Sequence, residues 1–146
     1  MILGFSIVAP NDFPTFGNLV NIVNQVALTA IISAGLTVVL IVGELDLSIG
    51  YGASLAGVLV TGLMVRQGLS IPIAIILVVL LGAVVGLINS LIVTKARVNS
   101  VVATLGVGTL LIGFNYAYSS GQPISAGVSN AFFMISLGSI LGIPYT

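Results

Sequence analysis

Long runs without any charged side chain are the feature that most restricts what this chain can fold into. The chain has 146 residues, of which three are acidic and three are basic, and residues 19–42 carry no charge at all. A helix of about 20 apolar residues crosses the hydrocarbon core of a bilayer. Charged residues make up 4% of the chain, against roughly 25% in a soluble domain. The sequence therefore predicts an all-α integral membrane protein, a polytopic bundle of transmembrane helices.

Turn residues divide the chain into four expected spans and a candidate fifth. Prolines, glycines and charges punctuate the apolar runs, as they do where helices end. The spans are predicted over about residues 19–42, 49–65, 71–93 and 101–118, with a shorter apolar stretch over 131–142. We expect them to form part of a single transmembrane domain over residues 1–146. Residues 1–9 are expected to be the end of a further helix, and the chain is expected to stop within a longer protein.

Short polar residues mark where these helices should begin, because their side-chain oxygens can accept hydrogen bonds from unpaired backbone N–H groups in a first helical turn. The expected caps are Asn18 for the first span, Asp46 or Ser48 for the second, and Ser100 for the fourth. Glycines at positions 82 and 86 form a GxxxG pattern, which predicts close helix packing.

A polar stretch, Gly43-Glu44-Leu45-Asp46-Leu47-Ser48-Ile49-Gly50, places two of the three carboxylates between uncharged runs. A carboxylate in hydrocarbon is costly unless it is paired or hydrated, so this stretch must lie at a membrane boundary or against protein. Two interpretations of Asp46 stay open: a gate or hinge in a transport pathway, or a helix cap. Glu44 could be hydrated or could pair with Lys95 or Arg97.

Polar side chains gather on one face of two expected spans. At 100° per residue these side chains fall on the same side of a helix. Polar side chains are costly against lipid, so this side must face protein or water. Because amides and hydroxyls bind solute hydroxyls as readily as neighbouring helices, both a pathway lining and interhelical contacts remain open. The residues are Asn21, Asn24, Gln25 and Thr29 in the first span, and Thr104 and Asn115 in the fourth.

Two basic residues, Lys95 and Arg97, lie within one short loop. The positive-inside rule places such a loop in the cytoplasm. Counting spans from there puts Arg66 and Asp12 outside, and residues 43–50 at the cytoplasmic side or re-entrant from it.

The residues that are missing exclude several classes of function. The chain has no cysteine and no histidine, which removes disulfides, thiolate chemistry and histidine-based metal sites or general bases. No basic patch could hold nucleic acid. An intramembrane enzyme would have to use Glu44 and Asp46, but carboxylates two residues apart point away from each other on a helix. A membrane scaffold is a further alternative, although it would leave the polar faces without a role.

Several motifs in order along the chain resemble the permease subunits of ABC importers for simple sugars, of the ribose, xylose and galactose type. The polar stretch over 43–50 is similar to the G-(G/E)-I-D-L-S-V-G signature of that family. Two departures are an Asn at position 99, where Pro is common, and a length about half that of such permeases. The other matching motifs are Asn18-Leu19-Val20-Asn21-Ile22, Gly86-Leu87-Ile88-Asn89, Lys95-Ala96-Arg97-Val98, Ala103-Thr104-Leu105-Gly106 and Gly121-Gln122-Pro123-Ile124.

The resemblance implies a multi-pass protein of the bacterial inner membrane that forms a pathway for a sugar such as ribose or xylose. It implies as partners membrane lipid, a cytoplasmic ABC ATPase, a second permease subunit, a soluble substrate-binding protein and the sugar itself. No P-loop motif occurs, so ATP hydrolysis is expected in the separate ATPase, and no cofactor or metal is expected here. Related permeases for branched-chain amino acids, nucleosides or a furanose signal remain alternatives.

Overall fold

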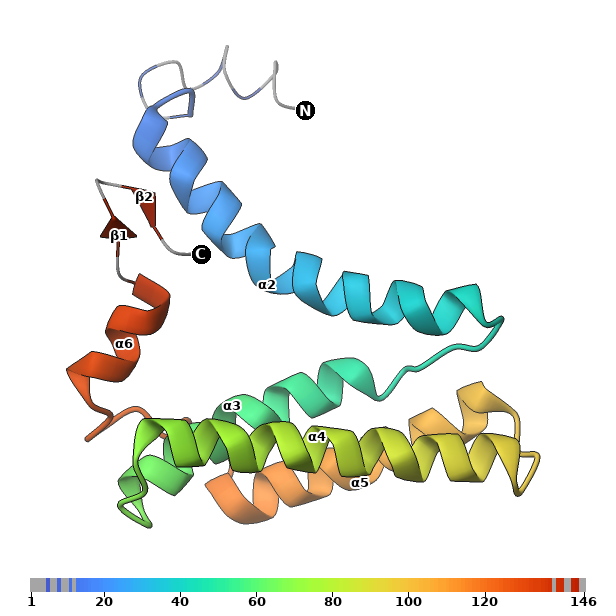
Figure 1. Ribbon diagram of the computed structural model, residues 1–146. Coiled ribbons are helices and arrows are strands. Elements are labelled where there is room, and N and C mark those ends of the chain that lie inside the picture. Colours follow the sequence, from blue (N-terminus) through green and yellow to red (C-terminus); the bar gives the residue numbers. More distant parts are fainter. Residues whose placement is uncertain are drawn as a thin grey trace. The chain divides into compact units, whose positions relative to one another are not determined.

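The computed structural model describes residues 5, 8, 11, 13–137, 139–140 and 143–144. The helices in this part of the chain are α2 (Phe16–Ile41), α3 (Ile49–Val65), α4 (Ile71–Thr94), α5 (Ser100–Ser119) and α6 (Asn130–Leu137) (Figure 1). Two short strands, β1 (Ser139–Ile140) and β2 (Ile143–Pro144), pair antiparallel. The all-α membrane fold predicted from the sequence is confirmed. The helix end expected over residues 1–9, and Asp12, fall outside the described residues or on isolated ones.

Three of the described helices are long and apolar enough to cross a membrane. They are α2 with 26 residues, α4 with 24 and α5 with 20. Helix α3 is apolar but has only 17 residues, which at 1.5 Å per residue is about 25 Å. Helix α3 therefore has about the minimum length of a transmembrane helix.

The candidate fifth span over 131–142 is not one helix. Helix α6 ends at Leu137 after eight residues, and the strand pair follows it. Glycines at positions 138 and 142 lower the helix propensity of this stretch. An eight-residue helix is about 12 Å long, too short to cross a bilayer.

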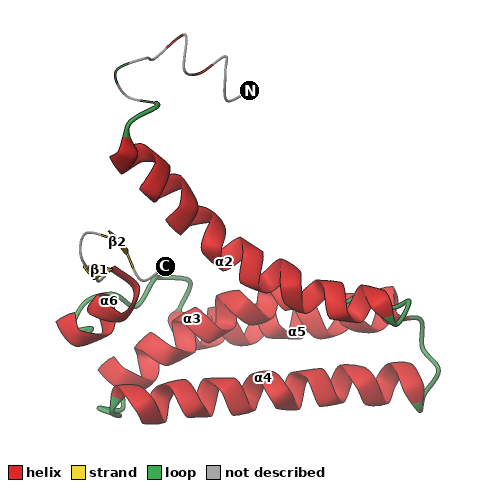
Figure 2. Ribbon diagram, turned by 45° about the horizontal axis from the view of Figure 1, so that its top comes forward, coloured by secondary structure: helices red, strands yellow, loops and turns green. Residues whose placement is uncertain are grey.

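Residues 34–129 form one compact unit, while residues 1–33 and 130–146 form another. In the first unit α3, α4 and α5 pack against one another, and both views show these three helices side by side (Figures 1 and 2). Buried Leu55 from α3 meets Val107 and Leu111 from α5, and Val85 of α4 packs against this cluster. The unit therefore contains a three-helix bundle in which each of α3, α4 and α5 contacts the other two.

The close helix contacts in this bundle come from other glycines than those the sequence singled out. A methyl group at Gly62 would lie 2.6 Å from the Tyr118 hydroxyl, and one at Gly108 would lie 2.9 Å from Cε2 of Tyr51. Gly82 and Gly86 have no described atom within 4 Å of such a methyl group. The GxxxG packing prediction is wrong within the described chain, because these two glycines border a cavity instead.

The helix caps also differ from the expected ones by a few residues. Helix α2 begins at Phe16, so Asn18 lies inside its first turn, and the Asn18 N–H donates to the Thr15 hydroxyl at 3.3 Å. Helix α5 begins at Ser100, and Asn99 caps it by accepting a 3.0 Å hydrogen bond from the Val101 N–H. Thr15 and Asn99 occupy these positions because each helix starts earlier than its apolar run.

The C-terminal ends of α3 and α5 are joined by one arginine. The Arg66 guanidinium donates to the Tyr118 carbonyl, and its Cζ lies 5.1 Å from the centre of the Tyr118 ring. The Tyr118 hydroxyl in turn donates to Gln67 at 3.0 Å. These contacts hold α3 and α5 together at their C-terminal ends. At their N-terminal ends, the polar stretch before α3 contacts α5.

Candidate functional site

Helix α2 ends in a turn that only a glycine makes easily. Gly43 has φ of +81°, the left-handed conformation that closes many helices. The Gly43 N–H donates to the Leu40 carbonyl at 3.0 Å and the Glu44 N–H to the Val39 carbonyl at 3.3 Å. This Schellman turn satisfies the last carbonyls of α2 and releases the chain into the non-helical segment 44–48.

Hydroxyl groups on α5 hold that segment in place. The Leu45 N–H donates to Ser100 Oγ at 3.3 Å, and the Leu47 N–H donates to Thr104 Oγ1 at 3.1 Å. Two residues of extended chain advance about 6.6 Å and four residues of helix about 6.0 Å, so the two spacings match. In an apolar bundle, non-helical backbone is stable only when its polar groups are paired in this way.

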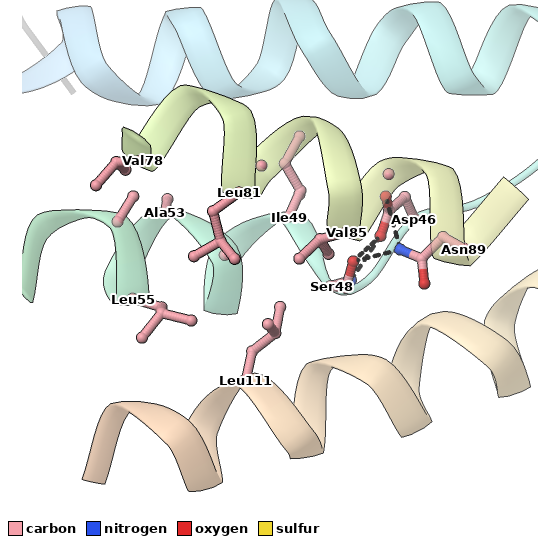
Figure 3. A pocket seen from close by; sticks show the side chains of 14 residues that line it. Asp46, Ser48, Ile49, Ala53, Leu55, Val78, Leu81, Val85, Asn89 and Leu111 are labelled. Atoms are coloured by element: carbon pink, nitrogen blue, oxygen red, sulfur yellow. Dashed lines mark hydrogen bonds between the residues drawn. The ribbon is translucent and has the colours of Figure 1, made fainter. Parts of the chain in front are cut away.

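Asp46 lies at the centre of a small hydrogen-bond network with Ser48 and Asn89 (Figure 3). Its Oδ1 accepts hydrogen bonds from the Ser48 N–H at 2.8 Å and from the Ser48 hydroxyl at 2.6 Å. Asn89 Nδ2, from α4, donates to Ser48 Oγ at 2.8 Å and lies 3.5 Å from Asp46 Oδ2. The network thus ties the start of α3 to the C-terminal part of α4.

Ser48 occupies the N-cap position of α3, but its side chain makes no capping hydrogen bond. Asp46 accepts from the N–H of Ser48 itself, one residue before the first helical turn. The expected cap is therefore replaced by a turn that precedes the helix. Asp46 fixes Ser48, and Ser48 is then free to accept from α4.

The orientation of the Asn89 amide follows from the donors available. The single hydroxyl proton of Ser48 goes to Asp46, so Ser48 Oγ can only accept from Asn89. The amide nitrogen must therefore face Ser48 and Asp46. The amide oxygen is turned away from them (Figure 3) and is buried without a hydrogen-bond partner among the described residues.

Two cavities meet at this network. One, of about 310 Å³, lies between α3 and α4 and is lined mainly by aliphatic side chains, with Asp46, Ser48 and Asn89 as its polar end (Figure 3). The other, of about 380 Å³, is bordered by residues of α4, of α5 and of the segment around Glu44. Asp46 and Asn89 line both cavities, as does Gly86, which explains the open space at that glycine.

The predicted site residues do not all come together in the structure. Asp46 and Ser48 belong to the segment 44–48, and Thr104 of α5 contacts it. Ser48 and Thr104 are buried, with 2% and 3% of their surface exposed. Glu44 lines the second cavity. Lys95 and Arg97 are exposed, and neither forms an ion pair with Glu44 within the described residues.

Asn115 belongs to a different, more polar cavity. Its amide donates to Ser54 Oγ at 3.0 Å. The surrounding cavity of about 470 Å³ also includes Tyr51, Tyr116 and Gln122. Polar groups of this kind cannot face lipid, so this side of α3 and α5 lies against protein or water.

The polar face of α2 is present, but its side chains are unengaged. Asn24 is half-buried, and Asn21, Gln25 and Thr29 are exposed. None of the four makes a side-chain hydrogen bond to another described residue. The pathway interpretation of these residues stays a prediction.

Asn89 is the site residue that the sequence analysis did not single out for a role. It lies in α4, the most apolar of the described helices, and it is 6% exposed. A single amide in such a helix is a usable signal, since polar side chains within apolar spans are commonly functional. Its partners could not be named, because Asp46 and Ser48 are 43 and 41 residues away.

Fold and site together define a multi-pass membrane protein in which buried polar side chains border cavities between helices, the arrangement of a membrane transport protein. The chain belongs to the family of permease components of the branched-chain amino acid transport system, whose profile matches residues 18–140.

Among curated proteins, the ribose import permease protein RbsC of Haemophilus influenzae is 38% identical over 136 residues, which is 91% of this chain and 42% of that protein. The galactose/methyl galactoside import permease protein MglC of the same organism is 35% identical over 142 residues, which is 86% of this chain and 42% of that protein. The autoinducer 2 import system permease protein LsrD of Salmonella paratyphi B is 34% identical over 119 residues, which is 78% of this chain and 36% of that protein.

The chain thus spans less than half the length of these relatives. The predicted resemblance to sugar import permeases is confirmed, as is a multi-pass protein of the bacterial inner membrane. No solved structure matches the chain.

Proposed function

We propose that this chain is part of the transmembrane subunit of an ATP-driven importer and contributes to the pathway for a simple sugar such as ribose or xylose. The observation that carries the proposal is collinear similarity to ribose import permeases over about nine-tenths of this chain. Residues 1–146 would then form part of one transmembrane permease domain. The whole pathway would also need the remaining length that such relatives have.

The cavities fit a hydroxylated solute. Sugar hydroxyls both donate and accept, and the polar groups in the bundle are amides, hydroxyls and one carboxylate, which offer both functions. Small-molecule sites commonly have volumes of 300–1,000 Å³ and a few polar groups in an apolar wall. The cavities at Asp46 and at Asn115 have about 310 and 470 Å³.

The energy for transport would come from a separate subunit. The sequence has no phosphate-binding loop, so this chain would not hydrolyse ATP and would act without catalysis of its own. Its partners would be a cytoplasmic ABC ATPase, a second permease subunit, a soluble sugar-binding protein and membrane lipid. The basic loop with Lys95 and Arg97 would face the ATPase side of the membrane.

A furanose signal is the second candidate solute. The relative named for autoinducer 2 import is 34% identical over 119 residues, close to the identity of the ribose permeases. The same hydroxyl-binding groups would bind a simple sugar or a furanose signal. The shape of the cavities would then decide which of the two solutes is transported.

Uptake of radiolabelled ribose, xylose and galactose tests the proposal. The measurement uses cells that express this chain within its complete transporter, with cells that lack the permease gene as the control. Uptake of one sugar that needs both this chain and the ATPase supports it. If none of these sugars enters and autoinducer 2 does, the second candidate replaces the first.

A further inference from the structure

We propose that Asn89 contacts the transported solute directly, with its amide oxygen accepting a hydrogen bond from a solute hydroxyl where the two cavities meet. The inference rests on the proposed function and deepens it, because it assigns one contact and one residue to the pathway.

The starting point is an acceptor without a donor. Asn89 is more than nine-tenths buried, and its Oδ1 has no partner among the described residues. Buried polar atoms in native proteins are almost always hydrogen-bonded, and an orphaned one calls for an explanation. The donor must therefore be a group that enters the space beside the amide.

Rotation of the amide would cost more than it gains. Its oxygen would lie against the Asp46 carboxylate, and the Ser48 proton would have to leave its 2.6 Å hydrogen bond to Asp46. Ser48 and Asp46 are therefore positioning residues, because they fix the nitrogen side and aim the oxygen away from the network (Figure 3).

Location favours a solute as the missing donor. Asn89 lines both the cavity of about 310 Å³ and that of about 380 Å³. Its Oδ1 is closed off from both in this structure, so a solute would reach the oxygen when the wall between the two cavities opens during transport. Neither of the two basic side chains nearest in sequence, Lys95 and Arg97, donates to it in the described chain. The carboxylate of Asp46 beside it adds acceptor capacity, which suits a ligand rich in hydroxyl donors.

Binding of sugars to the purified protein tests this contact. The chain would be purified in detergent as its full permease without the soluble binding protein, since that protein has its own sugar specificity. Thermal stabilisation by D-ribose and by its single-deoxy analogues would give apparent affinities. The variants are the wild type, Asn89→Ala and a control, Thr109→Val. Among the described residues, the Thr109 hydroxyl bonds only the Leu105 carbonyl of its own helix.

We expect the wild type to bind one deoxy analogue about five- to tenfold more weakly than ribose, the effect of one lost hydrogen bond. Asn89→Ala should bind ribose more weakly by a similar factor and should no longer distinguish that analogue, since both partners of one bond have been removed. Thr109→Val should keep the discrimination. A purely structural Asn89 would weaken all sugars alike and leave the discrimination unchanged, which would overturn the proposal.

A second measurement covers the case in which Asn89→Ala does not fold. Ribose should slow hydrogen exchange of the wild-type amides at 45–49 and 86–92 at least twofold, and should leave those at 66–70 unchanged. Absence of this protection, in a protein whose cells import ribose, overturns the inference and leaves the proposed function in place. Absence of any sugar uptake overturns the proposed function itself.

Discussion

At the scale of a residue, the Thr104 hydroxyl is one of the two on α5 that hold the non-helical segment. Thr104 Oγ1 accepts from the Leu47 N–H at 3.1 Å and donates to the Ser100 carbonyl at 2.7 Å. Thr104→Val keeps the shape of the side chain but removes the acceptor of the part-buried Leu47 N–H. We expect a loss of about 1–3 kcal/mol in the free energy of unfolding.

Chemical denaturation of the detergent-solubilised protein would measure this loss. Thr104→Ser is the matched control, because it keeps the hydroxyl and should stay within about 1 kcal/mol of the wild type. Equal stability of the Val and Ser variants would show that the Leu47 N–H finds another acceptor.

At Gly62 the constraint is space rather than hydrogen bonding. An added methyl group would lie 2.6 Å from the Tyr118 hydroxyl, whereas at Gly57, in the same helix, no described atom lies within 4 Å. Gly62→Ala must displace the ring that Arg66 holds, so we expect a cost of about 1–3 kcal/mol. Gly57→Ala should be neutral or stabilising, because alanine favours the helix. Thermal unfolding of the two variants compares them, and an equally stable Gly62→Ala would mean that α3 and α5 can separate there without cost.

At the scale of an element, the segment 44–48 joins three helices through side chains, and Asp46 is its main anchor. Asp46→Ala removes the acceptor for both Ser48 donors, and with it the position of Ser48 and Asn89. Asp46→Asn keeps one oxygen for the Ser48 N–H but brings an NH₂ group toward the Asn89 donor. We expect stability and uptake to fall in the order wild type, Asn, Ala, with about 1–3 kcal/mol lost in the Ala variant.

Unfolding and uptake measured on the same two variants would also separate the two interpretations of Asp46. A turn-forming role alone predicts that the Asn variant keeps most of its uptake. A gate that needs the charge predicts that uptake is lost while stability is largely kept. A fully active and stable Asp46→Ala protein would rule out both.

The helices could be predicted from the sequence because long uncharged runs have few alternatives in a membrane. The predicted start at residue 49 and the end near 65 match α3, and the other three spans differ by a few residues at most. Caps were harder, because Ser100 and Asn99 are both good capping residues and only the backbone path decides between them. The network of Asp46, Ser48 and Asn89 was beyond reach, since it depends on how α3 and α4 pack.

At the scale of the whole molecule, the direction in which the bundle crosses the membrane is the main prediction. The basic loop at 95–97 is expected in the cytoplasm and the turn at 120–129 outside, since α5 runs between them and is 20 residues long. The chain has no cysteine, so one introduced cysteine reports one position without background. Ala96→Cys and Ser125→Cys suit this test, because both residues are exposed and lie in these two loops.

Intact cells would be treated with a membrane-impermeant maleimide, and permeabilised cells would serve as the control for reactivity. We expect Ser125→Cys to react in intact cells and Ala96→Cys only after permeabilisation. The opposite pattern would reverse the bundle and place residues 43–50 at the outer side, where they could not lie close to an ATPase. Because orientation here depends on Lys95 and Arg97, the double change to Glu should weaken the preference, so that Ala96→Cys becomes partly reactive from outside. Unchanged labelling after that double change would mean that other parts of the assembled permease fix the orientation.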